Sequence, residues 1–501
     1  MTDPIETELA QWMTRGGDAR IVLDPATGLN RYASAPYPRE VLAFASSTAN
    51  DISPEAHAFL AANWRDAAAG LEQGAAYGAA LEGFRAQIRA AYGLDARTEV
   101  FFAPSGTDLE YVGLLAAAGR RAGGIVNCLL GKDEVGSGCI HSAAGAYFAD
   151  ETALVTAVSP GQPIAGLPPI ALEDLPVRNA DGEAHASAEL IAAMTAMVEQ
   201  AHGLDQFPLI HVVHGSKTGL VLPHLDHVDA LQARFGDGVL FVVDACQARI
   251  TSQALRGYLD RGMIVFVTGS KFMGGPPFSG FALLPSGLAE RAAPVAAGMA
   301  SVFRRAELPV GWPGREVCED SGNPGLALRL AASLFELERF QQLSIARVAR
   351  IVAEFTRATD RLAARIGARK VASAPPEDLG EQAEHPIEML TLVTLDLCHD
   401  PAGKRLRALH FDDATRLHKA LIDEEIRLGQ PVRCVMLGND DAGGTVWGAT
   451  LRIGLSMPQV TRFDALDDAA LAARFSAAMG RIEARLAALL EVPGEPAPAI
   501  A

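Results

Sequence analysis

The stretch FVVDACQARI (residues 241–250) decides the fold. An uninterrupted apolar run ends in Asp244, and Gln247 follows three positions later. Continuous apolarity is typical of a strand covered on both faces, and ligands of α/β proteins bind beyond the carboxyl ends of such strands. Asp244 is therefore placed to hold a cationic ring N–H group. The commoner alternative is a carboxylate that caps the next helix.

A second stretch, IVFVTGSKFMGGPPFSG (residues 264–280), places Lys271 just beyond another apolar strand, in a turn rich in Gly and Pro. A lysine at such a position is expected to be buried. Burial and neighbouring cations lower the pKa of a lysine amine, which then forms an imine with a carbonyl compound. Thr268 and Ser270 add hydroxyl groups that can bind a phosphate.

A third stretch, FFAPSGTDLEY (residues 101–111), runs from a strand through Ser105, Gly106 and Thr107 into a helix. The free backbone N–H groups at a helix N-terminus favour anions. Together with the two hydroxyls and the glycine they would form an anion-binding turn, residues 105–107, which we call the cup. Taken alone this pattern is weak, because such residues begin many helices.

Short apolar runs alternate with Ala-rich helical stretches through the first two thirds of the chain. This succession predicts an α/β fold with a mostly parallel sheet. The region 326–366 reads as one long connecting helix, and a smaller α+β domain follows it. The predicted strands of the large sheet are 99–102, 125–129, 209–213, 239–243, 264–268 and 280–284, with helices at 184–203 and 226–235. The later predicted elements are strands at 389–397 and 449–456 and a helix at 414–425.

Composition excludes several classes of function. The 501 residues carry 43 Lys and Arg against 60 Asp and Glu, a net charge of −17, which disfavours binding to nucleic acid or to anionic membranes. Six cysteines without CxxC pairs predict neither a disulfide framework nor a zinc ribbon, and they suit a reducing compartment. No apolar run reaches the ~18–20 residues of a membrane span. We expect a soluble cytoplasmic protein without a metal site.

Four segments in order, PSGTD (104–108), HGSKTG (214–219), DACQ (244–247) and TGSKFMGGP (268–276), carry a family resemblance. Together they resemble the fold-type-I pyridoxal-phosphate (PLP) enzymes of the class-V aminotransferase and cysteine desulfurase type. The resemblance covers roughly residues 100 to 280. It implies a mostly parallel mixed sheet in a large domain, followed by a smaller α+β C-terminal domain.

The resemblance also assigns roles to residues. It implies that Lys271 forms the Schiff base with PLP, that Asp244 pairs with the pyridinium nitrogen, and that Gln247 contacts the 3-oxygen of the cofactor. The other cofactor contacts that we predict are Ser105, Gly106, Thr107, Ser216, Thr268, Ser270 and Asn323. Asn323 lies in DSGNPG (320–325), which resembles a segment that reaches the phosphate of the neighbouring subunit. The family resemblance thus predicts a homodimer with shared active sites.

The substrate contact is predicted near the C-terminus. TLRIGLS (450–456) resembles an element whose arginine binds the substrate α-carboxylate, here Arg452, although an exposed strand cation is an equal alternative. The sequence departs from the family pattern at several points, among them Ser270, which stands where the family commonly has a histidine. The stretch 133–138 offers no ring to stack on the cofactor, with His141 and Tyr147 further on, and no obvious reactive cysteine occupies the desulfurase position.

The sequence therefore predicts a PLP-dependent aminotransferase that acts on an amino acid through Lys271. A PLP-dependent lyase or replacement enzyme is the alternative within the same chemistry, because one electron sink serves all these reactions. A noncatalytic PLP-fold binding protein is the alternative of another class. The expected organisation is an N-terminal arm (1–45) that covers the site, with Tyr32 and Arg39 as candidates, a large PLP-binding domain (46–325), and a connecting helix with a small domain (326–501).

Overall fold

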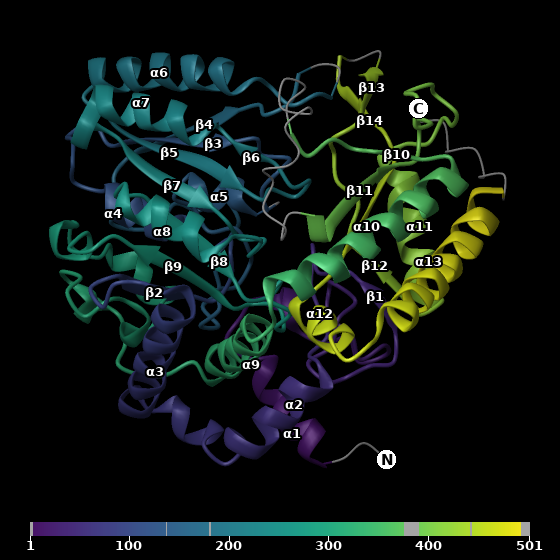
Figure 1. Ribbon diagram of the computed structural model, residues 1–501. Helices are drawn as coiled ribbons and strands as arrows, with labels where there is room; N and C mark the ends of the chain where they lie inside the picture. The colour runs from purple at the N-terminus through teal and green to yellow at the C-terminus, as the bar shows by residue number, and fades with distance from the viewer. Residues whose placement is uncertain (1–3, 137, 180–181, 375–389, 441–442, 492–501) are drawn as a thin grey trace.

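A mixed eight-stranded sheet forms the centre of the first part of the chain (Figure 1). The computed structural model describes residues 4–136, 138–179, 182–374, 390–440 and 443–491. Neighbouring strands follow the order β2-β9-β8-β7-β5-β3-β4, with β6 paired to β5. Only β9 and β6 run antiparallel to the rest of this sheet. The strands are β2 (Glu99–Ala103), β3 (Ile125–Leu130), β4 (Ile170–Leu175), β5 (Phe207–His214), β6 (Val221–Leu222), β7 (Leu240–Asp244), β8 (Ile264–Thr268) and β9 (Gly280–Leu284).

Both faces of this sheet are covered. Successive side chains of a strand point to opposite faces, so Val100 and Phe102 join one hydrophobic core while Phe101 and Ala103 join the other. The first core contains side chains of α3 (Gly74–Tyr92), α6 (Ser187–Gly203), α7 (Leu225–Phe235), α8 (Ser252–Asp260) and α9 (Pro324–Gln341). The second contains side chains of α4 (Glu110–Ala117) and of the region 288–318. This double cover explains why the strands are almost continuously apolar.

The C-terminal part packs around a third core and a three-stranded antiparallel sheet, β10-β11-β15. The segment that ends the predicted arm joins this part, because β1 pairs with β12 in parallel. The elements are α10 (Ile345–Ile366), β10 (Arg369–Lys370), β11 (Leu392–Asp396), α11 (Phe411–Asp423), β12 (Ile426–Leu428), β13 (Met436–Asn439), β14 (Thr445–Trp447), β15 (Thr450–Gly454), α12 (Met457–Phe463) and α13 (Asp468–Glu491). The remaining elements are α1 (Pro4–Met13), β1 (Leu42–Phe44), α2 (Pro54–Asn63) and α5 (Cys139–Ala143).

The predicted fold class is confirmed, but one prediction about an element is wrong. The region 326–366 is two helices, α9 and α10, and not one. Ser344 explains the break, because its backbone is extended and its side chain accepts a hydrogen bond from the Arg347 N–H, as an N-cap does. The boundaries of the three predicted domains stay a prediction. Among the residues described, we find no helix long and apolar enough to cross a membrane.

Candidate active site

A cavity of about 540 Å³ lies beyond the carboxyl ends of β2, β7 and β8. Its walls come from parts of the chain far apart in sequence. We call residues 105–107, Asp244 and 268–271 the sheet edge, and we call residues 430–433 with Arg452 the facing segment. Residues from before position 50 also reach the cavity, namely Arg20, Tyr32, Ser47 and Thr48.

Lys271 lies in the turn that follows β8 and lines the cavity. Asn50 fixes this turn, because its side-chain amide donates to the carbonyls of Ser270 (2.9 Å) and Lys271 (2.7 Å). Gly269 and Gly275 let the turn pack against Ser333 of α9, since a Cβ at either glycine would lie 2.3 Å or less from the Ser333 Oγ. Burial, then the Arg452 guanidinium, lower the pKa of Lys271 to about 8. A substantial fraction of this amine is therefore neutral near pH 8.

Asp244 ends β7, the strand next to β8, and its carboxylate lines the same cavity. Its Oδ1 accepts a hydrogen bond from the Cys246 N–H at 2.9 Å, which orients the carboxylate at the strand end. Burial and this neighbouring carboxylate raise the pKa of the Cys246 thiol. Cys246 is thus a neutral thiol beside Asp244 and lacks the thiolate character of a reactive cysteine.

Ser105, Gly106 and Thr107 connect β2 to α4 and line the same end of the cavity. Gly106 is required for close packing, because a Cβ there would lie 3.0 Å from the Thr268 Cγ2 and 3.4 Å from the Cys246 Sγ. Thr268 donates to the Cys246 carbonyl at 2.7 Å, and Ser270 donates to the Thr268 hydroxyl at 3.3 Å. Backbone N–H groups and hydroxyls at a strand-to-helix turn suit a phosphate.

The sequence matches no family model and no curated protein. Solved structures do match it. A NifS-like protein aligns over 89% of this chain and 100% of its own, at 12% identity and a TM-score of 0.53. An alanine–glyoxylate aminotransferase from Nostoc sp. aligns over 91% and 96%, at 15% identity and a TM-score of 0.51. A variant of C-DES, with glycine covalently linked to its PLP cofactor, aligns over 88% and 96%, at 15% identity and a TM-score of 0.50.

The chain has the fold-type-I architecture of PLP-dependent enzymes. At identities this low the likeness establishes the fold, and the chemistry must be argued from the residues. Eight of the predicted site residues line the cavity at the ends of β2, β7 and β8. Those that line it are Ser105, Gly106, Thr107, Asp244, Thr268, Ser270, Lys271 and Arg452.

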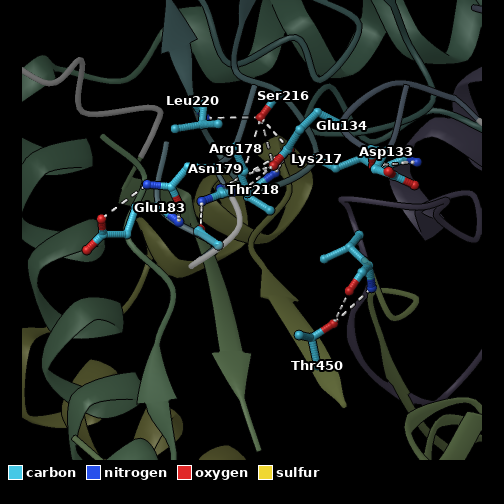
Figure 2. Close-up of polar contacts among 12 residues, drawn as sticks. Asp133, Glu134, Arg178, Asn179, Glu183, Ser216, Lys217, Thr218, Leu220 and Thr450 are labelled. Carbon is cyan, nitrogen blue, oxygen red and sulfur yellow. Dashed lines mark hydrogen bonds and ion pairs between the residues drawn. The ribbon is translucent and has the colours of Figure 1, made fainter. Parts of the chain in front are cut away.

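Three predicted residues do not line the cavity. Gln247 is buried beside it, where its amide donates to the Ser47 carbonyl (3.3 Å) and its Oε1 accepts from Arg249 (2.7 Å). Asn323 caps α9, accepting from the Leu326 N–H at 3.0 Å. Ser216 donates to the Glu134 carboxylate at 2.7 Å (Figure 2). Direct cofactor contacts by these residues stay a prediction, as does the reach of Asn323 into a second subunit.

Arg452 belongs to the cavity wall and is not an exposed strand cation. It lies in the middle of β15 and donates to the carbonyls of Gln430 (2.8 Å), Ser47 (3.2 Å) and Lys217 (3.4 Å) and to the Thr48 hydroxyl (3.1 Å). Burial lowers its pKa to about 10, so it remains charged at neutral pH. Within the described ranges no carboxylate forms an ion pair with it. A buried arginine without a counter-ion suits a ligand carboxylate.

Several cavity residues were missed from the sequence. Arg20 lies between two phenyl rings, 5.1 Å from the centroid of Phe148 and 4.9 Å from that of Phe278, and pairs with Asp18 at 2.7 Å. No motif marks Arg20, which reaches the cavity only because the N-terminal segment crosses it. The other missed cations are Lys132, Lys217 and Arg433. Lys217 had a signal, because it sits inside the HGSKTG segment next to Ser216.

Of the residues considered as a cover over the site or as a ring against the cofactor, one lines the cavity and three do not. Tyr32 lines the cavity, whereas Arg39 does not and pairs instead with Asp51 at 3.8 Å. His141 and Tyr147 also lie outside the cavity wall, and the Tyr147 hydroxyl bonds to Ser301 at 2.9 Å. The neighbouring wall positions are Gly136, Cys139, Ile140 and Phe278.

Proposed function

We propose that this protein is a PLP-dependent enzyme that acts on amino acids, with aminotransfer as its reaction. The observation that carries the proposal is one cavity in which Lys271 and Asp244, from the ends of adjacent strands, lie with the cup at Gly106. When bound, PLP supplies an aldehyde that condenses with amines and a ring that withdraws electrons from the substrate Cα.

The residues present fit that cofactor. The crowded Gly106 leaves backbone N–H groups, and no side chain, at the turn where a phosphate would sit. Asp244 offers a carboxylate that would keep a ring nitrogen protonated, because an adjacent negative charge stabilises the cation. Lys271 offers an amine that is partly neutral at working pH, as an attacking nucleophile must be.

Within this site each residue has a separable task. Arg452 would hold the substrate carboxylate, because it lines the cavity and its hydrogen-bond partners among the described residues are neutral carbonyl and hydroxyl groups. Lys271 Nζ, once free, would accept the proton from the substrate Cα and would then donate it to C4′ of the cofactor. A lowered amine pKa near the operating pH favours transfer in both directions.

The experiment is a single-turnover assay of the PLP-loaded protein with a panel of amino acids. We expect one equivalent of keto acid per site without an acceptor, with the cofactor recovered as pyridoxamine phosphate, and further turnover only when a keto acid is added. Keto acid and free ammonia produced repeatedly without an acceptor would replace aminotransfer by a lyase reaction. No change in any amino acid, together with no PLP binding, would contradict the proposal altogether.

A further inference from the structure

The cavity wall carries cations beyond those assigned to the cofactor and to the substrate α-carboxylate. Among the described wall residues six are cations and two, Asp133 and Asp244, are carboxylates, although the whole chain carries a net charge of −17. Asp244 and Lys271 belong to the proposed cofactor site, and Arg452 to the α-carboxylate. Arg20 lies toward the cup, where its charge acts on Asp108. Lys132, Lys217 and Arg433 remain without a task.

Lys217 is held in place by a buried polar cluster (Figure 2). The Glu134 carboxylate accepts from Arg178 (3.0 Å), Ser216 (2.7 Å) and the Thr218 N–H (3.1 Å), so the residues on both sides of Lys217 are anchored. The Lys217 N–H itself donates to the Glu134 carbonyl at 3.0 Å. Arg178 neutralises Glu134 within this cluster. Lys217 itself lines the cavity.

The amine of Lys217 has one hydrogen bond, to the Asp133 backbone carbonyl at 3.1 Å, and within the described residues no ion pair. Burial and the nearby Arg452 lower the pKa of Lys217, whereas the Glu134 and Asp133 carboxylates raise it. Arg452 donates to the Lys217 carbonyl at 3.4 Å, so the two residues are immediate neighbours.

Arg433, on the facing segment, lines the same cavity, and like Lys217 it acts on the charge of the Asp133 carboxylate. The preceding residue, Val432, is bound to β15 by two hydrogen bonds with the Thr450 hydroxyl, at 2.9 and 2.7 Å. Thr450 lies two positions from Arg452 on the same strand, so the backbone next to Arg433 is tied to β15 near Arg452. The Arg433 guanidinium stacks on the Phe411 ring, 4.9 Å from its centroid, and no described carboxylate pairs with it. Lys132, by contrast, is already paired with Asp174 at 3.3 Å.

We propose that Lys217 and Arg433 bind an anionic group at the end of the substrate side chain while Arg452 binds its α-carboxylate. The preferred substrates are then amino acids whose side chains end in a carboxylate, sulfonate or phosphate. This inference rests on the proposed function, because it assigns binding residues to the side chain of the same amino acid substrate. Arg433 supplies a planar fork for the anion, and Lys217 supplies a compact charge deeper in the wall.

The test compares matched amino acids with the PLP-loaded protein. The cofactor absorbance is followed during titration with L-glutamate and L-glutamine, L-aspartate and L-asparagine, and O-phospho-L-serine and L-serine. We expect the anionic member of at least one pair to bind about tenfold to a hundredfold more tightly, the range for a charge-assisted hydrogen bond. The pair with the largest ratio identifies the anion and the chain length.

Two variants and one control assign the effect to residues. Arg433→Gln and Lys217→Gln should each reduce the anionic-to-neutral affinity ratio about tenfold, whereas Lys419→Gln, at an exposed position of α11 outside the cavity wall, should leave it unchanged. Arg433 is exposed, so its replacement is compatible with folding. A second readout without turnover is the rise in melting temperature caused by glutarate relative to butyrate, which both variants should diminish.

The outcomes separate this inference from the proposed function. Tight binding and transamination of neutral amino acids, with no advantage for anionic ones, would overturn the anion subsite and leave the proposed function intact. An anionic preference that survives both variants would overturn the assignment to Lys217 and Arg433. No spectral change with any amino acid would overturn both.

Discussion

The sheet edge and the facing segment line one cavity but are built in different ways. At the sheet edge, strand ends and glycine turns place Asp244, Lys271 and Gly106, so the positions follow from the large sheet alone. On the facing segment, Arg452 is held by carbonyls of Ser47, Gln430 and Lys217, which come from three separate parts of the chain. The first region suits an invariant cofactor. In the second region, a substitution in any of the contributing segments can alter which substrate binds.

The comparison predicts different kinetic consequences for the two regions. Loss of a sheet-edge residue should impair cofactor chemistry for every amino acid. Loss of a residue of the facing segment should impair binding of some amino acids more than others.

The largest effect is expected for Lys271→Ala. Removal of the amine should lower the single-turnover rate by about 10²–10⁴-fold, because a positioned proton carrier contributes that much. Lys419→Ala, an exposed lysine elsewhere, is the matched control. Stopped-flow absorbance with the PLP-loaded variants measures both rates. An equal rate in the two variants would remove Lys271 from the chemistry.

Asp244→Asn should have the next largest effect. The amide keeps the size of the side chain and its acceptor for the Cys246 N–H, but it carries no charge to stabilise a protonated ring. We expect kcat/KM to fall by about a hundredfold, the upper range for a charge-assisted hydrogen bond, and to fall alike for all amino acids. A loss confined to one class of substrate would contradict the division between the two regions.

On the facing segment, Arg452→Gln should act on binding. We expect KM for amino acids to rise about ten- to a hundredfold with a smaller change in kcat, because the ligand loses a charged partner in ground state and transition state together. PLP binding itself should stay within about twofold of the parent protein. Strong loss of PLP would place Arg452 in the cofactor site instead.

The smallest effect concerns pH. The lowered pKa of Lys271, about 8 against the ordinary 10.5, means that the reactive neutral amine is gained as pH rises through 8. The rate at which the protein without cofactor captures PLP should therefore increase about tenfold between about pH 7 and pH 9 and then level off. A rate that keeps rising toward pH 10.5 would show that the amine is not perturbed.

Much of the sheet edge was predictable because strand ends carry local patterns. Continuous apolarity marked β7 and β8, and the Gly-rich turn marked Lys271. The edge strand β4 was missed, because IALEDL contains Glu173 and Asp174 and is covered less fully than the central strands. The break at Ser344 was missed because apolar spacing continues through it.

The facing segment was largely beyond prediction from the sequence. Arg452 was found through a resemblance, but its partners were not, since they meet only when residues 47, 217 and 430 come together. Arg20 enters the cavity through tertiary packing and carries no local sequence pattern, whereas Lys217 lies inside HGSKTG and was still not predicted as a site residue. Gln247 and Asn323 were predicted to contact the cofactor, but their side-chain amides donate hydrogen bonds to the backbone of distant segments, Gln247 to Ser47 and Asn323 to Gly16.

The central claim is that Lys271 forms the covalent link to PLP, and the cavity contains a second lysine, Lys217, that makes the claim testable by position. The measurement is borohydride reduction of the PLP-loaded protein followed by proteolysis and peptide mass spectrometry. We predict one pyridoxyl group per chain, on Lys271. A modification on Lys217, or none on either lysine, would contradict the account.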